Sequence, residues 1–173
     1  MAKSNKRQAA VDAQSKFGNA ATSAGIQTHI GKRAVAAEYR DAVSLQAGWN
    51  HTESVDLDTH FVGSEPNASR WDYGVGVRRA RTELVFWIEP HPASSTGEVK
   101  RLVEKVKWLK EKLESREFKL LSDLTDETSN QGYSPFCWIH SGTLRIIPNS
   151  KEAKMLAQHG IKAPTRRLEL PVK

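Results

Sequence analysis

The chain has 173 residues and a net charge of +6 at pH 7, and this length is enough for one domain with a single sizeable core. It contains no apolar run of about 18 residues and no N-terminal apolar stretch of about 7–15 residues, so we expect neither a membrane span nor a signal peptide. The single cysteine, Cys137, excludes an internal disulfide and a cysteine-based zinc site, and it favours a cytoplasmic protein.

The positive charge is concentrated at the N-terminus. Residues 1–33 contain six basic residues and one acid, a net charge of +5, whereas the rest of the chain is close to neutral at +1. Weak hydrophobic periodicity and many small polar residues predict that residues 1–32 form a disordered basic arm and that residues 33–173 form one domain. Such an arm either contacts nucleic-acid phosphates without sequence specificity or keeps the protein in solution.

The first half of the domain has the pattern of one helix followed by three strands. Helical spacing of apolar residues predicts a helix over 33–47 that ends before Gly48. Alternating or continuous apolar residues then predict strands at 54–62, 70–78 and 82–89. The short links between these strands favour an antiparallel meander, and the third strand is apolar on both faces, which is typical of a central strand.

The second half begins with a capping box of Ser95 and Glu98, which predicts the start of a long amphipathic helix. Residues 117–124 fit either a short helix or a strand, and residues 125–135 are typical of a loop. The remaining pattern predicts a hairpin turning at Ser141–Gly142, a short helix opened by a capping box of Asn149 and Glu152 and closed by Gly160, and an edge strand near 166–170. This order predicts an α/β (α+β) fold: a three-layer sandwich in which flanking helices cover a mixed sheet with an antiparallel meander.

Two carboxylates lie on neighbouring predicted strands. Asp72 lies inside the second strand and Glu89 ends the third, so they are separated by about one strand spacing of 4.8 Å. Carboxylate oxygens are the ligands that Mg²⁺ and Mn²⁺ prefer, and this pair could share one ion, with Glu98 as a further candidate ligand. Lys105 and Lys107 flank the apolar stripe of the following helix, where an ammonium group could stabilise phosphate charge. Charges at the margins of a packed helix are also common without any function.

This arrangement resembles the PD-(D/E)xK nuclease superfamily, as a divergent bacterial or phage member. The shared order is helix, strand meander, Asp on the second strand, Glu-x-basic at the end of the third strand, then helix and strand, over about residues 33–141. The resemblance implies that Asp72 and Glu89 bind Mg²⁺ or Mn²⁺ and that a lysine two residues after the glutamate assists the attacking water. His91 stands at that position instead. In some members the lysine lies on the following helix, which would give its role to one of the two helix lysines.

Two further polar groups have open interpretations. His91 is a candidate metal ligand, a general base near neutral pH or a structural hydrogen-bonding group. Asp56, Asp58 and His60 are expected on one face of the first strand, where they form either a second divalent-ion site or a solvated surface.

The leading functional hypothesis is a metal-dependent nucleic-acid phosphodiesterase. Its expected catalytic residues are Asp72, Glu89, His91, Lys105 and Lys107, and its expected metal ligands are Asp72, Glu89 and Glu98.

The alternative hypothesis is a non-catalytic nucleic-acid- or protein-binding module on the same scaffold. Gly74 and Gly76 leave the sheet face beside Asp72 almost bare, which predicts a docking groove, and Trp108 is a candidate partner contact. Three arginines form a basic turn between the second and third strands, which is either a phosphate contact or a solvated hairpin tip: Arg78, Arg79 and Arg81.

Overall fold

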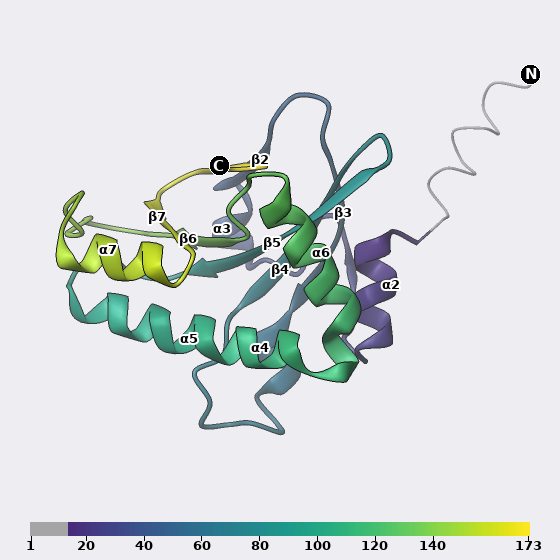
Figure 1. Cartoon of the computed structure of the whole chain (residues 1–173), viewed down its shortest axis with the longest axis horizontal. Coiled ribbons are helices and arrows are strands. Elements are labelled where there is room, and N and C mark those ends of the chain that lie inside the picture. Colours follow the sequence, from purple (N-terminus) through teal and green to yellow (C-terminus); the bar gives the residue numbers. More distant parts are fainter. Residues whose placement is uncertain (1–13) are drawn as a thin grey trace, which may run out of the picture.

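A mixed sheet forms the centre of the molecule (Figure 1). In the computed structural model, which describes residues 14–173, this sheet consists of β1 (His29–Ile30), β3 (Asn50–Asp56), β4 (Tyr73–Arg79), β5 (Thr82–Pro90), β6 (Phe136–Ile139) and β7 (Ile161–Thr165). The strands lie in the order β1-β3-β4-β5-β6-β7. The pairs from β1 to β5 are antiparallel, and β5, β6 and β7 are parallel. The predicted mixed sheet with an antiparallel meander is therefore confirmed.

Helices cover one face of the sheet, and a smaller layer covers the other. The helices are α2 (Lys16–Ser23), α3 (Ala37–Arg40), α4 (Leu57–Phe61), α5 (Gly97–Glu114), α6 (Lys119–Asn130) and α7 (Lys151–Gln158). Residues of α2, α5, α6 and α7 share one apolar cluster with one face of the sheet. The opposite face packs against α3 and a parallel pair of strands, β2 (Val43–Leu45) and β8 (Leu168–Leu170). The predicted three-layer α+β sandwich is confirmed.

Strand β5 is central, as its sequence predicts. It pairs with β4 on one side and with β6 on the other, and its apolar side chains are buried on both faces. Val85 and Trp87 face the helices, whereas Phe86 and Ile88 face the smaller layer. Because side chains alternate along a strand, Glu89 falls on the helical face with Trp87. This alternation directs a carboxylate toward α5.

Residues 14–32 are not a disordered arm. Ser15 caps α2 by accepting a hydrogen bond from the backbone N–H of Gly18 at 2.9 Å. Phe17 is fully buried, and its ring packs edge-on against Trp87 with the ring centroids 6.4 Å apart. The predicted boundary at residue 32 is wrong because one buried aromatic residue anchors this segment to the main core. The basic residues Lys3, Lys6 and Arg7 lie outside the described residues.

Two predicted elements before β4 are wrong in type or extent. The helix predicted over 33–47 is only one turn, α3, because Val43 and Leu45 pair with β8 from the far end of the chain. The strand predicted over 54–62 ends at Asp56, whose side chain caps α4 by accepting from the N–H of Thr59 at 2.8 Å. The apolar spacing therefore predicts the wrong element in both places. Pairing with β8 replaces part of the helix, and the Asp56 cap ends the strand early.

The loop predicted over 125–135 is mostly helix, because α6 extends to Asn130. Its buried stripe consists of Leu121, Leu124, Thr125 and Thr128 at helical spacing. Two of these four residues are threonines, so the stripe is only half apolar and is hidden from a hydrophobic pattern.

The end of the chain also differs from the prediction. The hairpin predicted at Ser141–Gly142 does not form, since β6 pairs in parallel with β5 and β7. Ser150 rather than Asn149 caps α7, with its hydroxyl accepting from the N–H of Ala153 at 3.1 Å. The strand expected near 166–170 is β8, which joins the smaller sheet.

Within residues 14–173 no helix is long and apolar enough to cross a membrane.

Candidate functional site

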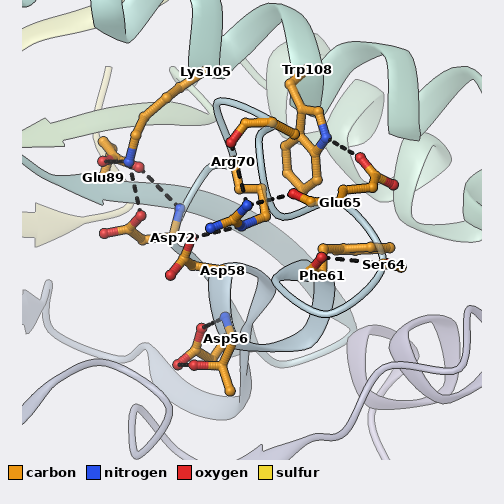
Figure 2. A network of polar contacts seen from close by, with 12 residues as sticks. Asp56, Asp58, Phe61, Ser64, Glu65, Arg70, Asp72, Glu89, Lys105 and Trp108 are labelled. Carbon is orange, nitrogen blue, oxygen red and sulfur yellow. Dashed lines mark hydrogen bonds and ion pairs between the residues drawn. The ribbon is translucent and has the colours of Figure 1, made fainter.

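Three side chains from different elements meet where the two central strands β4 and β5 begin and end, respectively (Figure 2). Asp72 lies immediately before β4, Glu89 near the end of β5, and Lys105 in the middle of α5. The Nζ atom of Lys105 donates to Asp72 Oδ1 at 3.0 Å and to Glu89 Oε1. The backbone N–H of Asp72 donates to Glu89 Oε2 at 3.0 Å. Of the two helix lysines in the prediction, the structure brings Lys105 into contact with both carboxylates.

The sequence positions these groups through strand register and helix packing. Tyr73 pairs with Ile88 across the antiparallel strands, so the residue before β4 lies opposite Glu89. On α5 the apolar stripe faces the sheet, with Leu102, Val106 and Leu109 fully buried. Lys105 lies beside this stripe, and its long side chain runs along the helix margin to reach the ends of β4 and β5.

Burial dominates the electrostatics of the site. Glu89 is fully buried; this burial and the neighbouring Asp72 charge raise its pKa well above the usual range, although Lys105 opposes the shift. Burial likewise raises the pKa of Asp72, against the opposing charge of Lys105. Burial lowers the pKa of Lys105, but the two carboxylates more than offset that effect, and the net shift is upward. Burial thus favours the neutral, protonated forms of the two carboxyl groups, and the ammonium of Lys105 offsets this effect in part.

His91 and Glu98 form a second pair beside the first. The Nε2 atom of His91 lies 2.5 Å from Glu98 Oε2, and its Nδ1 atom lies 3.9 Å from Glu89 Oε1. Two hydrogen bonds hold the main chain of His91 in place. Its N–H donates to Ile139 O at 2.9 Å, and the indole Nε1 of Trp138 donates to His91 O at 2.8 Å. The imidazole is thus held between two glutamates.

Two predicted roles on α5 differ from the structure. Glu98 does not form a capping box, because the helix N-cap is Thr96 without a side-chain hydrogen bond and Glu98 contacts His91 instead. Lys107 is exposed, and no salt bridge of Lys107 exists within the part of the chain that the structure describes. Among residues 14–173 no group of three or more His, Cys, Asp or Glu side chains is arranged to hold a metal ion.

A polar network extends from the site toward α4 (Figure 2). The backbone N–H of Leu57 donates to Asp72 O at 2.8 Å. Arg70, two residues before Asp72, donates through Nε to Asp58 Oδ1 at 2.8 Å. The sequence prediction did not include Arg70, although a basic residue beside Trp71-Asp72 is visible in the sequence. The expected Asp56-Asp58-His60 face does not exist, because Asp56 ends β3 and the other two residues lie on α4.

The glycines and the tryptophan that were expected to contact a partner make contacts within the molecule instead. A side chain at Gly74 would collide with the Trp87 ring, and one at Gly76 would collide with Phe17. These glycines therefore make room for two core aromatic residues rather than for a partner. Trp108 is mostly buried, and its Nε1 donates to Glu65 Oε2 at 2.7 Å.

The basic turn lies at the far end of the sheet. Strand β4 runs from Tyr73, beside the site, to Arg79, a length of roughly 20 Å. Arg78 pairs with Glu83 at 2.6 Å, and the Arg79 guanidinium lies 4.7 Å from the Trp49 ring centroid. Arg81 is exposed at the turn. Arg78 and Arg79 therefore make local contacts, and all three arginines lie at the end of β4 away from Asp72.

The geometry thus defines a partly buried site of two carboxylates and one lysine at the ends of β4 and β5. No family model, curated protein or solved structure matches the chain. The chemistry of the site must be inferred from its own residues.

Proposed function

We propose that this protein is a metal-dependent nucleic-acid phosphodiesterase. The observation that carries the proposal is the position of Lys105, whose ammonium contacts the carboxylates of both Asp72 and Glu89. Phosphodiester hydrolysis requires a hard cation at paired carboxylates and a positive group that stabilises phosphate charge. Asp72 and Glu89 are the paired carboxylates that would hold such a cation, and Lys105 is the positive group.

The order of the elements supports a relation to the PD-(D/E)xK nucleases. The chain forms an antiparallel meander of β3, β4 and β5, continues through α5 and α6, and returns as β6 parallel to β5. Asp72 precedes the second strand of this meander, and Glu89 lies on the third. The lysine comes from the following helix, which agrees with the variant in which it has moved away from the third strand.

Mg²⁺ or Mn²⁺ fits the donor set. Asp72 and Glu89 both reach one ammonium group, so their oxygens lie within the span of a single small ion. Burial raises the pKa of both carboxyl groups, so a bound cation would compete with protons for their oxygens. Mg²⁺ commonly takes only one or two protein carboxylates and completes its shell with water and phosphate oxygens. The bound ion would polarise the phosphoryl group and lower the pKa of a bound water.

The side chains of this protein have separate roles in the proposal. Asp72 and Glu89 would hold the cation, and Lys105 would stabilise the negative charge that develops on the phosphate. Glu98 fixes the His91 ring beside Glu89, so that His91 acts as an accessory group at the same end of β5. Lys107 has no role. The proposal includes a nucleic-acid substrate. It also includes a cytoplasmic location, which the single, buried cysteine Cys137 favours.

The direct test is cleavage by purified protein. Plasmid, single-stranded DNA and RNA are incubated with Mg²⁺, with Mn²⁺ or with EDTA, and products are resolved on gels. We expect metal-dependent cleavage that Asp72→Ala abolishes. Asp126→Ala, which changes an exposed aspartate on α6, is the matched control and should cleave normally. Cleavage that persists unchanged in Asp72→Ala would assign the activity to a contaminant or to another site.

A further inference from the structure

Arg101 lies at the exposed rim of the candidate site. Residues three or four apart on a helix are neighbours on its surface, so Arg101 lies one turn before Lys105 on the same side of α5. The side chain of Arg101 is 69% exposed, whereas those of Lys105 and Asp72 are 20% and 24% exposed and that of Glu89 is fully buried. A substrate that approaches the two carboxylates from solvent therefore passes the guanidinium of Arg101.

A chain of three side-chain contacts joins Arg101 to the buried carboxylate. The Nη1 atom of Arg101 lies 3.6 Å from Glu98 Oε2, the same oxygen that lies 2.5 Å from His91 Nε2. The Nδ1 atom of His91 in turn lies 3.9 Å from Glu89 Oε1. Lys105 contacts that same Glu89 oxygen from the next turn of α5. These contacts place Arg101 beside the site, on the helical face of the sheet to which Glu89 points.

The guanidinium of Arg101 is only weakly engaged within the molecule. Its distance of 3.6 Å to Glu98 is beyond the range of a hydrogen bond, and exposed ion pairs of this kind contribute little to stability. His91 lies much closer to the same Glu98 oxygen, so Glu98 keeps a partner when Arg101 turns away. Among residues 14–173, Arg101 forms no other salt bridge. Its planar fork of N–H donors is therefore available for two oxygens of a phosphate.

In the opposite direction along α5, the polar groups already have partners within the molecule (Figure 2). Trp108, one turn after Lys105, donates through Nε1 to Glu65 Oε2 at 2.7 Å, and Lys112 forms a salt bridge with the same carboxylate. The loop that carries Glu65 is itself held in place, since Arg70 Nη1 donates to Glu65 O at 2.6 Å. A polyanion that extends from the site along α5 therefore meets an available cation in the direction of Arg101, whereas Lys112 is already paired.

We propose that Arg101 binds a backbone phosphate of the substrate, next to the phosphate that is cleaved. The inference rests on the proposed phosphodiesterase function and adds a substrate-binding residue to it. The four residues from Arg101 to Lys105 rise about 6 Å along the helix, which is comparable to one or two nucleotide steps of about 3.4 Å each along a strand. The contact makes the preferred substrate an oligonucleotide with at least two phosphates rather than a single phosphate ester.

The first test is binding of a fluorescein-labelled single-stranded octanucleotide to full-length protein in EDTA, followed by anisotropy at several salt concentrations. We expect Arg101→Ala to weaken binding about 5-fold and to reduce the slope of log K against log salt by about 0.7, the value for one lost phosphate contact on a single strand. Arg101→Lys keeps the charge and should keep the wild-type slope. Arg81→Ala, at an exposed arginine in the turn after β4, is the matched control and should change affinity less than about twofold. Equal effects of the two alanine substitutions, or an unchanged slope in Arg101→Ala, would overturn the proposal.

The second test separates a neighbouring phosphate from the cleaved one. A dinucleoside monophosphate contains a single phosphate, so the loss of kcat/KM in Arg101→Ala should be about 5-fold larger on the octanucleotide than on this short substrate, and it should appear in KM. Equal losses on both substrates would assign Arg101 to the cleaved phosphate and refute the proposal. Cleavage that requires Asp72 while Arg101→Ala binds like the wild type would refute the Arg101 proposal alone. Binding that depends on Arg101 without any metal-dependent cleavage would instead refute the phosphodiesterase proposal and leave Arg101 as a phosphate contact.

Discussion

Strand β5 carries a buried glutamate at each end, and the two have different surroundings. Glu83, near the start, accepts from Arg78 Nε at 2.8 Å and from the backbone N–H of Phe17 at 3.3 Å. One carboxylate thus meets one guanidinium. Glu89, near the other end, shares the single ammonium of Lys105 with Asp72. That end has two carboxylates for one cation.

This difference separates a structural ion pair from a functional site. A buried pair of matched charges satisfies its own hydrogen bonds and gains nothing from a further ion. The Glu89 end has two carboxyl groups around one ammonium, and burial there raises the pKa of both Asp72 and Glu89. Strongly shifted groups that share a charge partner cluster at functional sites. The comparison predicts that changes at the two ends affect different properties.

The largest effect is expected from loss of the Lys105 charge. Lys105→Met keeps most of the aliphatic side chain along α5 but removes the ammonium that would stabilise phosphate charge. We expect kcat to fall about 100–1000-fold, the range for loss of one preorganised charge-stabilising donor. Steady-state cleavage of a labelled oligonucleotide measures this. Lys107→Met, an exposed lysine two residues away, should change kcat less than about twofold. Equal losses in both variants would contradict the assignment of Lys105.

A substitution at Glu83, at the start of β5, should instead lower the stability of the fold. Glu83→Gln removes the charge that pairs with Arg78 and weakens the bond to the Phe17 N–H, which anchors α2. We expect the free energy of unfolding to fall by about 2 kcal/mol, in the range for lost hydrogen bonds to charged groups. Urea denaturation followed by tryptophan fluorescence measures it. Glu127→Gln, at an exposed site on α6, is the control. A stable Glu83→Gln variant with lost cleavage would reverse the proposed assignment of the two ends.

Much of this fold is predictable because its central elements carry local signals. Strand β5 is a continuous apolar run, and α5 has a complete apolar stripe, so both appear at nearly the predicted positions. Their register and packing also bring Asp72, Glu89 and Lys105 together, as the sequence pattern suggested. Side-chain alternation and helix periodicity decide these contacts, and both are properties of the local sequence.

The remaining elements depend on partners distant in sequence. Residues 43–45 form a strand only because β8 lies beside them, more than a hundred residues later. The hidden stripe of α6 uses Thr125 and Thr128 to bond Trp87 and the backbone of Val85. No local pattern specifies such tertiary contacts.

A smaller loss of activity is expected when His91 is removed. His91→Ala deletes the ring that lies between Glu89 and Glu98. We expect kcat to fall about tenfold, in the range for groups that orient ligands rather than bind the substrate, with little change in KM. Kinetics over a range of oligonucleotide concentrations separate the two constants. A rise in KM with unchanged kcat would instead make His91 a substrate contact.

The smallest expected effect is a change in stability when Glu89 is substituted. We expect this change to be a gain in stability, whereas substitution of Glu83 causes a loss. The pKa of Glu89 is raised by burial and by Asp72, so its stabilising contribution is present below the unfolded-state pKa of about 4.3 and is lost as pH rises through the folded-state pKa. The neutral side chain of Glu89→Gln cannot ionise, so this variant does not lose stability as the pH rises. We expect the variant to match the wild type near pH 4 and to unfold at higher urea concentration near pH 8, although it cannot cleave.

Urea midpoints measured from pH 4 to pH 8 on both proteins give this comparison directly. The effect is limited because Lys105 already offsets part of the burial of Glu89. A Glu89→Gln protein that is less stable than the wild type at pH 8 would make Glu89 a structural partner of Lys105, like Glu83 with Arg78. A gain in stability that accompanies loss of cleavage would instead show that the fold retains an unfavourable buried charge at this end of β5 for the sake of the reaction.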